Sequence, residues 1–248
     1  MVVSTRPVAL VTGSATGVGA ATALRLAKLG YALVVNYSRS ETQAREVVAA
    51  IEAIGSPVLL VRADVGVDSQ VRAATAEIDA TFGRLDVLVN NAAMTHFIDH
   101  PRLDLLTDPV WDDILGTNLM GTFYVCRAAM PLLIASGKGS IVNVTSVAGL
   151  TGGGSSIPYA ASKAAIDSLT RSLSRAFAPT VRVNSVAPGP IVSRWLGDHP
   201  EMIEKAVAVT PLRKASTPDD IADTIVYLAV GTSMTTGQVL VVDGGRTM

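Results

Sequence analysis

The chain has 248 residues, of which 49% are hydrophobic and 17% charged, and its formal net charge at pH 7 is −1. It carries no basic run that would bind nucleic acid. Its N-terminal residues lack the apolar core of a signal peptide, and it has no uninterrupted apolar run of about 18 residues, which a membrane span needs. The single cysteine, Cys126, excludes an internal disulfide and is typical of a protein of the reducing cytoplasm.

Apolar, β-branched runs alternate with helical patterns along the whole chain, which predicts a parallel sheet. The fold class is therefore α/β: one Rossmann-type, doubly wound parallel sheet of about seven strands with helices on both faces, formed by residues 1–248 as one domain. The predicted strands are residues 8–11, 32–36, 58–61, 87–89, 140–144, 182–186 and 239–242. The predicted helices are residues 17–29, 41–54, 69–82, 110–133, 159–177 and 218–230.

Two long connections, residues 92–109 and 188–217, follow predicted strands. Open α/β sheets bind ligands at the carboxyl ends of their strands, and long loops in compact domains usually have a function. Both connections are therefore predicted substrate loops.

A glycine-rich turn joins the first strand to the first helix. Such a turn directs free N–H groups and the positive end of the helix toward one point, where a pyrophosphate can bind. An ordinary tight turn is the alternative, but the position after the first strand favours a dinucleotide. The predicted contacts are Gly13, Ser14, Thr16, Gly17, Val18 and Gly19.

The end of the second strand indicates which dinucleotide binds. Proteins that bind NAD usually place a carboxylate there for the ribose 2′-hydroxyl, but this chain has Asn36 and no acidic residue before Glu41. Arg39 can bind a 2′-phosphate and Ser38 can add a hydroxyl, so NADP(H) is predicted in preference to NAD(H). A solvated loop arginine is the alternative interpretation of Arg39.

Tyr159 and Lys163 are four residues apart at the start of a predicted helix and share one face of it. Ser146 ends the strand before them. Tyrosine has an ordinary pKa near 10, and lowering that pKa to about 8 needs about 2.7 kcal/mol. An ammonium about 4 Å away offers roughly 4 kcal/mol at an effective dielectric near 20, which is enough. The three residues therefore predict acid–base chemistry at a substrate oxygen.

An ordered set of motifs covers essentially the whole chain. In this order the motifs resemble the compact type of the short-chain dehydrogenase/reductase family, and are similar to 3-oxoacyl reductases. They depart from the family at Ala93, where glycine is usual. The motifs are Thr12-Gly13-xxx-Gly17-x-Gly19, Asp64-Val65, Asn90-Asn91-Ala92-Ala93, Asn118, Ser146, Tyr159-xxx-Lys163, Pro188-Gly189 and Val242-Asp243-Gly244-Gly245.

The resemblance implies hydride transfer between a nicotinamide and a carbonyl or alcohol. Tyr159 would be the general acid or base, Lys163 would bind the nicotinamide ribose, Ser146 would bind the substrate oxygen, and Asn118 would hold a water that relays protons to Lys163. The family implies further cofactor contacts at Asp64 and Val65 beside the adenine, at Asn91 and Ala92 after the fourth strand, and at Pro188, Gly189, Ile191 and Ser193 beside the nicotinamide.

The predicted function is an NADPH-dependent ketone reductase or alcohol dehydrogenase, because enoyl reductases of the family space tyrosine and lysine further apart. A sugar or polyol dehydrogenase is an alternative, and a dinucleotide-binding regulator without turnover is an alternative of another class. The resemblance also implies a homotetramer or homodimer. Few basic residues lie at the ends of the central helices, which leaves acyl carrier protein docking unsupported.

Two features are interpreted as structural. His96 and His100 are four residues apart, but Pro101 argues against a helix there and no third ligand is in view, so no metal site is predicted. Cys126 lies in an apolar helical pattern and is interpreted as a packing residue.

Overall fold

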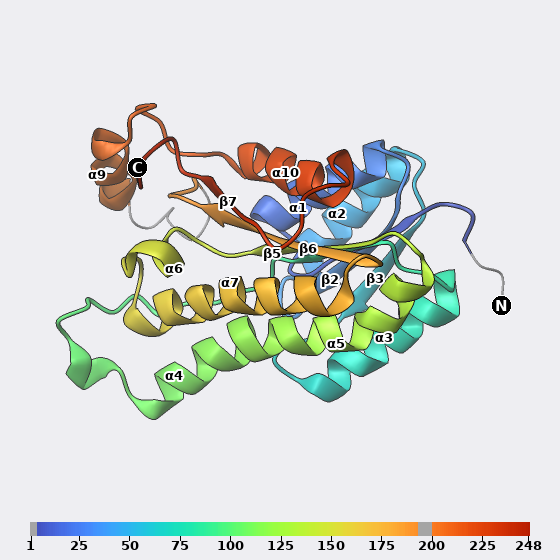
Figure 1. Cartoon of the computed structure of the whole chain (residues 1–248), viewed down its shortest axis with the longest axis horizontal. Coiled ribbons are helices and arrows are strands. Elements are labelled where there is room, and N and C mark those ends of the chain that lie inside the picture. Colours follow the sequence, from blue (N-terminus) through green and yellow to red (C-terminus); the bar gives the residue numbers. More distant parts are fainter. Residues whose placement is uncertain (1–3, 193–199) are drawn as a thin grey trace.

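The computed structural model describes residues 4–192 and 200–248 (Figure 1). These residues form one seven-stranded sheet in the order β3-β2-β1-β4-β5-β6-β7, with every neighbouring pair parallel. The predicted fold class is confirmed. The strands are β1 (Val8–Val11), β2 (Ala32–Tyr37), β3 (Val58–Arg62), β4 (Val87–Asn90), β5 (Gly139–Val144), β6 (Val181–Pro188) and β7 (Val239–Val242).

Helices cover both faces of the sheet. Figure 1 shows α1, α2 and α10 on one face, and α3, α5 and α7 on the other. Their bounds are α1 (Gly17–Lys28), α2 (Glu41–Ala53), α3 (Asp68–Phe82), α4 (Asp108–Leu115), α5 (Gly121–Ala135), α6 (Ala148–Thr151), α7 (Ile157–Phe177), α9 (Pro200–Val209) and α10 (Pro218–Val226). Short turns of other helix types occupy Leu103–Leu105, Gly116–Met120 and Tyr227–Gly231.

The strands are apolar on both sides because neither face of the sheet meets water. In β1, Ala9 and Val11 pack toward α1, α2 and α10, whereas Val8 and Leu10 pack toward α3 and α5. All four side chains are buried. Strand order reverses between β1 and β4, so the loops after β1, β4, β5 and β6 meet at one edge, where ligands of such sheets bind.

The structure differs from the prediction in three helical regions. The predicted helix 110–133 is interrupted by a π-helical turn, Gly116–Met120. The predicted loop 188–217 contains α9, and α6 follows directly after β5. Both missed helices are short, and hydrophobic periodicity predicts short elements poorly because few turns sample the pattern.

The helical run Asp108–Ala135 is long and apolar enough to cross a membrane by length and composition. However, 44% of its apolar window is buried inside the molecule, where α5 packs against the sheet and α3. The core helix of a soluble protein passes the same test, so this helix is weak support for a membrane span.

Candidate active site

Two inward-facing side chains brace the glycine loop between β1 and α1. Asn36 accepts hydrogen bonds from the Gly13 N–H through Oδ1 at 3.1 Å and from the Ser14 N–H through its backbone oxygen at 3.0 Å. The Asn36 N–H donates to Ser14 Oγ at 3.0 Å, and Ser14 is fully buried. Their side chains hold the loop to β2, and the cofactor contacts predicted for both residues stay a prediction.

A second brace ties the same loop to the end of β4. Thr12 Oγ1 accepts hydrogen bonds from the backbone N–H groups of Asn91 and Ala92, each at 3.0 Å. Asn91 Nδ2 donates to the backbone oxygens of Thr12 and Gly13, again at 3.0 Å. Thr12 was missed as a site residue, although its position just before Gly13 in the motif was the available signal.

The braced loop fits a pyrophosphate. Among the described residues, the N–H groups of Gly17, Val18 and Gly19 donate to no backbone oxygen, as expected of the first turn of a helix. Gly17 has a φ of +57°, and a Cβ placed there would meet no protein atom within 4 Å, so this side of the loop is open. Unpaired N–H groups at a helix N-terminus are a general anion site.

The loop after β2 presents an unpaired arginine. Ser38 and Arg39 are exposed, and within the described part of the chain Arg39 has no hydrogen-bond or ion-pair partner. Glu41 is engaged by Arg45, which holds the pKa of the Glu41 carboxyl below its usual value. Arg62 is paired in the sheet with Tyr37 and is exposed beside this loop; the sequence analysis missed it.

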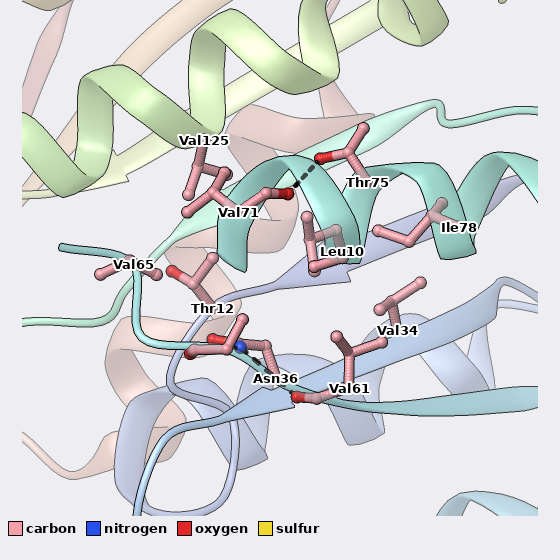
Figure 2. Close-up of a pocket in the computed structure, with 12 residues that line it drawn as sticks. Leu10, Thr12, Val34, Asn36, Val61, Val65, Val71, Thr75, Ile78 and Val125 are labelled. Carbon is pink, nitrogen blue, oxygen red and sulfur yellow. Dashed lines mark hydrogen bonds between the residues drawn. The ribbon is translucent and has the colours of Figure 1, made fainter. Parts of the chain in front are cut away.

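On the predicted adenine side, Asp64 Oδ1 accepts from the Gly66 N–H at 2.9 Å, and the Asp64 N–H donates to Gln70. Val65 is buried against Gly121. A small cavity lies beneath, between β1–β3 and the helices α3 and α5 (Figure 2). It is part of the core, because its lining is mostly valine, leucine, isoleucine and alanine side chains.

Tyr159, Ser146 and Lys163 come together at the ends of β5 and α7. Burial raises the pKa of Tyr159 to about 12, and a hydrogen bond with Ser146 partly offsets that shift. Lys163 Nζ lies 5.6 Å from the centroid of the Tyr159 ring and donates to the Val144 backbone oxygen at 2.9 Å. Burial also lowers the pKa of Lys163 to about 8.

The pKa of Tyr159 therefore moves in the direction opposite to the one predicted. Desolvation of the phenolate raises this pKa by more than the hydrogen bond with Ser146 lowers it. The protein groups alone keep Tyr159 protonated at neutral pH, which suits a proton donor. Lys163 has three N–H donors and one hydrogen bond among the described residues, so it retains donors for a ribose hydroxyl.

Asn118 lies in the π-helical turn and is fully buried. Its Oδ1 accepts from the Met94 N–H at 2.8 Å, and its Nδ2 donates to the Met94 backbone oxygen and to Ser162 Oγ, each at 3.0 Å. The amide thus joins the loop after β4 to the catalytic turn of α7. The water relay implied by the resemblance stays a prediction. Ser162 was missed, although it directly precedes Lys163.

The loop after β6 forms the opposite wall. The Gly189 N–H donates to the Val242 backbone oxygen at 2.9 Å, and a Cβ at Gly189 would lie 2.7 Å from Asp243 Cβ. Ile191 forms an isolated bridge with Ser216. Pro188 is the last residue of β6. Ser193, predicted beside the nicotinamide, lies outside the described residues.

His96 and Cys126, which the sequence indicated as structural residues, each have a side-chain hydrogen-bond partner. His96 pairs with Asp113 at 3.2 Å, and no group of three potential metal ligands occurs among residues 4–192 and 200–248. Cys126 is buried and receives a hydrogen bond from Asn90 Nδ2. Burial raises the pKa of its thiol to about 12, so it is not a nucleophile at neutral pH.

Comparison with known proteins defines the family. A family model described as enoyl-(acyl carrier protein) reductase matches residues 13–247. A crystal structure described as a short-chain dehydrogenase/reductase from Burkholderia xenovorans superposes with a TM-score of 0.93 and 37% identity, covering 98% of both chains. The chain belongs to the short-chain dehydrogenase/reductase family.

Two curated relatives of this short-chain dehydrogenase/reductase are described as acting on ketoacyl groups. A protein described as ketoacyl reductase 2 of the granaticin polyketide synthase of Streptomyces violaceoruber is 46% identical over 96% of this chain and 95% of its own length. The 3-oxoacyl-[acyl-carrier-protein] reductase of Staphylococcus aureus is 38% identical over 97% of this chain and 98% of its own length.

Family membership makes the protein an NAD(P)-dependent oxidoreductase that acts on C=O or CH–OH groups. The geometry agrees, because the open turn of the glycine loop and the Tyr159–Ser146–Lys163 group lie at the same carboxyl edge of the sheet. When bound, a nicotinamide supplies the hydride acceptor or donor, and the protein supplies the proton and the oxygen contact.

Proposed function

We propose that this protein is an NADPH-dependent reductase of ketones, with 3-oxoacyl groups or similar β-ketones as substrates. The observation that carries the proposal is Tyr159, a partly buried phenol that is protonated at neutral pH, hydrogen-bonded to Ser146 and adjacent to a buried lysine. Ketoacyl reductase relatives support the ketone, and the four-residue spacing of Tyr159 and Lys163 favours carbonyl over enoyl reduction.

In the proposed mechanism, the carbonyl carbon would receive the hydride that a bound, reduced nicotinamide supplies. Ser146 Oγ donates a hydrogen bond to the carbonyl oxygen as negative charge develops there. Tyr159 transfers its phenolic proton to that oxygen, which completes the alcohol. The Lys163 ammonium stabilises the tyrosinate that remains until the phenol takes up a proton from solvent, and Asn118 holds the catalytic turn of α7 in place.

The substrate would lie between the loops 92–109 and 188–217. The Ile98 N–H donates to the Ser155 backbone oxygen at 2.9 Å, which ties the first loop to the segment before α7. Phe97, Leu150 and Val192 are exposed apolar residues that follow the ends of β4, β5 and β6. These side chains favour an apolar acyl chain over a sugar.

A substrate screen tests the function. Purified protein is incubated with NADPH and, in separate assays, β-ketoesters, 3-oxoacyl thioesters, diketones, cyclic ketones and sugars. We expect NADPH oxidation to be fastest with β-ketoesters or thioesters. Faster turnover of polyols in the oxidative direction would replace the proposal with a polyol dehydrogenase. NADPH binding without turnover of any carbonyl or alcohol would favour a non-catalytic regulator.

The preference for NADP(H) is proposed on the unpaired Arg39 and on the engagement of Glu41 by Arg45. We expect Arg39→Ala to raise the KM for NADPH roughly ten- to a hundredfold, the size of one lost charge-assisted phosphate contact, and to change the KM for NADH less than about twofold. Steady-state kinetics with both cofactors measure the effect.

Arg45→Ala is the matched control, because this arginine lies one turn into α2 and is already paired with Glu41. It should leave the NADPH to NADH ratio of KM values nearly unchanged. Equal effects of Arg39→Ala on both cofactors would remove the phosphate assignment. A larger effect of Arg62→Ala than of Arg39→Ala would move the contact to β3.

From family membership we propose that the protein is a homotetramer or homodimer and that it lies in the cytoplasm. The only substrate partner that we propose is a small-molecule carbonyl or alcohol. The relatives are described as biosynthetic reductases, which supports these assignments. No nucleic-acid or membrane partner is proposed.

A further inference from the structure

A buried carboxylate stands one helical turn beyond the catalytic lysine. Lys163 and Asp167 occupy positions i and i+4 of α7, and each is only 3% exposed. Residues at this spacing share a helix face. Asp167 has no part in the mechanism above, yet a carboxylate is costly to bury without compensation.

Hydrogen bonding from Thr145 and Ser185 provides only part of that compensation. Neither carboxylate oxygen of Asp167 has a partner with regular hydrogen-bond geometry in the described part of the chain. The nearby hydroxyls have their regular hydrogen bonds elsewhere: Thr145 Oγ1 donates to the Val186 backbone oxygen at 3.1 Å, and Ser185 Oγ pairs with Thr170 Oγ1 at 2.7 Å. Thr170 Oγ1 in turn donates to the Ile166 backbone oxygen.

The charges around Asp167 come from its own helix. The pKa of the Asp167 carboxyl lies above its usual value, because burial raises it by more than the Thr145 and Ser185 hydroxyls and the charges of Arg171 and Lys163 lower it. The strands β5 and β6, which pack against this part of α7, contribute only hydroxyls. Arg171 is exposed to solvent, so its charge is screened more than that of the buried Lys163.

Lys163 needs a negative charge nearby, because a buried ammonium is costly without one. Its ammonium is buried and donates to the Val144 backbone oxygen, it lies near the Tyr159 ring, and the charge of Asp167 acts on it. Asp167 provides the only anionic side chain that acts on Lys163 among the residues the structure describes. The two groups are too far apart for direct contact, so the attraction acts through low-dielectric protein, where it is strong.

We propose that Asp167 is a positioning residue for Lys163: its carboxylate keeps the buried ammonium charged and held beside Val144 and Tyr159 at the pH of catalysis. Without this charge, Lys163 would be neutral near neutral pH and could not stabilise the tyrosinate. The consequence for turnover rests on the proposed function, whereas the effect on Lys163 itself does not.

The test measures the titration of Lys163 by NMR in protein labelled with ¹³C at the lysine ε-carbon. The Lys163 resonance is identified as the one that disappears in Lys163→Met. The resonances of the other lysines remain in that variant, namely Lys28, Lys138, Lys205 and Lys214. The wild-type midpoint is expected near the pKa of about 8. In Asp167→Asn, which keeps shape and removes charge, the midpoint should fall by at least about one pH unit.

Asp79→Asn on α3 is the matched control and should leave the Lys163 midpoint unchanged. If the protein turns over ketones as proposed, the alkaline limb of its kcat profile should move to lower pH by the same amount in Asp167→Asn. A purely structural role would lower kcat at every pH without moving that limb. An unchanged Lys163 midpoint in Asp167→Asn overturns the proposal, whether or not the protein reduces ketones.

If Asp167→Asn does not fold, the wild-type protein labelled at the aspartate carboxyl carbon decides the question. Asp167 should lose its proton at a lower pH than Lys163 does, so that both groups are charged over a shared range. An Asp167 that keeps its proton up to the Lys163 midpoint would overturn the proposal.

Discussion

Replacing Tyr159 by phenylalanine should lower kcat for NADPH-dependent ketone reduction by about 10³-fold or more, because it removes the proton donor. The substitution deletes one oxygen from a partly buried ring, and Ser146 loses its hydrogen bond to that oxygen. Binding of NADPH, followed by fluorescence, should weaken less than about threefold, since the glycine loop is untouched.

Tyr227→Phe is the matched control, because Tyr227 is half exposed at the end of α10 and is remote from the strand ends. It should retain wild-type turnover. Undiminished ketone reduction by Tyr159→Phe would show that another group supplies the proton. Loss of both turnover and NADPH binding would show that the Tyr159 hydroxyl supports cofactor binding and is not only a proton donor.

Replacing Gly19 by alanine should weaken NADPH binding at least about a hundredfold and lower the melting temperature. A Cβ at this position would lie 2.6 Å from both Gly13 O and Asn91 Nδ2, and 2.9 Å from Ser14 Cα. These atoms cannot move independently, because Thr12, Asn36 and Asn91 hold the loop by hydrogen bonds. Overpacking a rigid site forces a backbone shift that costs about 1–3 kcal/mol.

Gly116→Ala makes the same chemical change where the structure leaves room. No atom outside the local helix lies within 4 Å of a Cβ at Gly116, and its φ of −57° suits alanine. NADPH binding, measured by calorimetry, should therefore stay within about twofold of wild type. Equal binding by Gly19→Ala and the wild-type protein would contradict the pyrophosphate cradle proposed for this loop.

Local sequence patterns predicted the sheet closely. The predicted strands 8–11 and 239–242 coincide with β1 and β7. The remaining strands agree to within two residues at each end. Buried parallel strands appear in the sequence as continuous apolar runs, and segments with helical periodicity lie between them. Both patterns are local. The break at Asn118 and the helix α9 leave weaker patterns in the sequence. A π-helical turn keeps the helical pattern around it, and α9 is short.

Only those site residues that depend on local patterns could be predicted from the sequence. Tyr159 and Lys163 share a helix face by spacing alone, and Gly17 and Gly19 follow from the order of strand, turn and helix. The inward positions of Ser14 and Asn36 were not predictable, because they depend on how closely β1 and β2 lie side by side. Arg62 reaches the Arg39 loop only through the pairing of β2 with β3.

The sequence by itself determined the fold class and the family and predicted the catalytic side chains, because these depend on residue type, order and local spacing. Only the tertiary structure decided the electrostatics of those side chains. Burial raises the pKa of Tyr159 where the residue types alone indicated a lower one, and the role proposed for Asp167 depends on the burial of its carboxylate near Lys163. Desolvation depends on contacts between distant segments, and no local pattern records it.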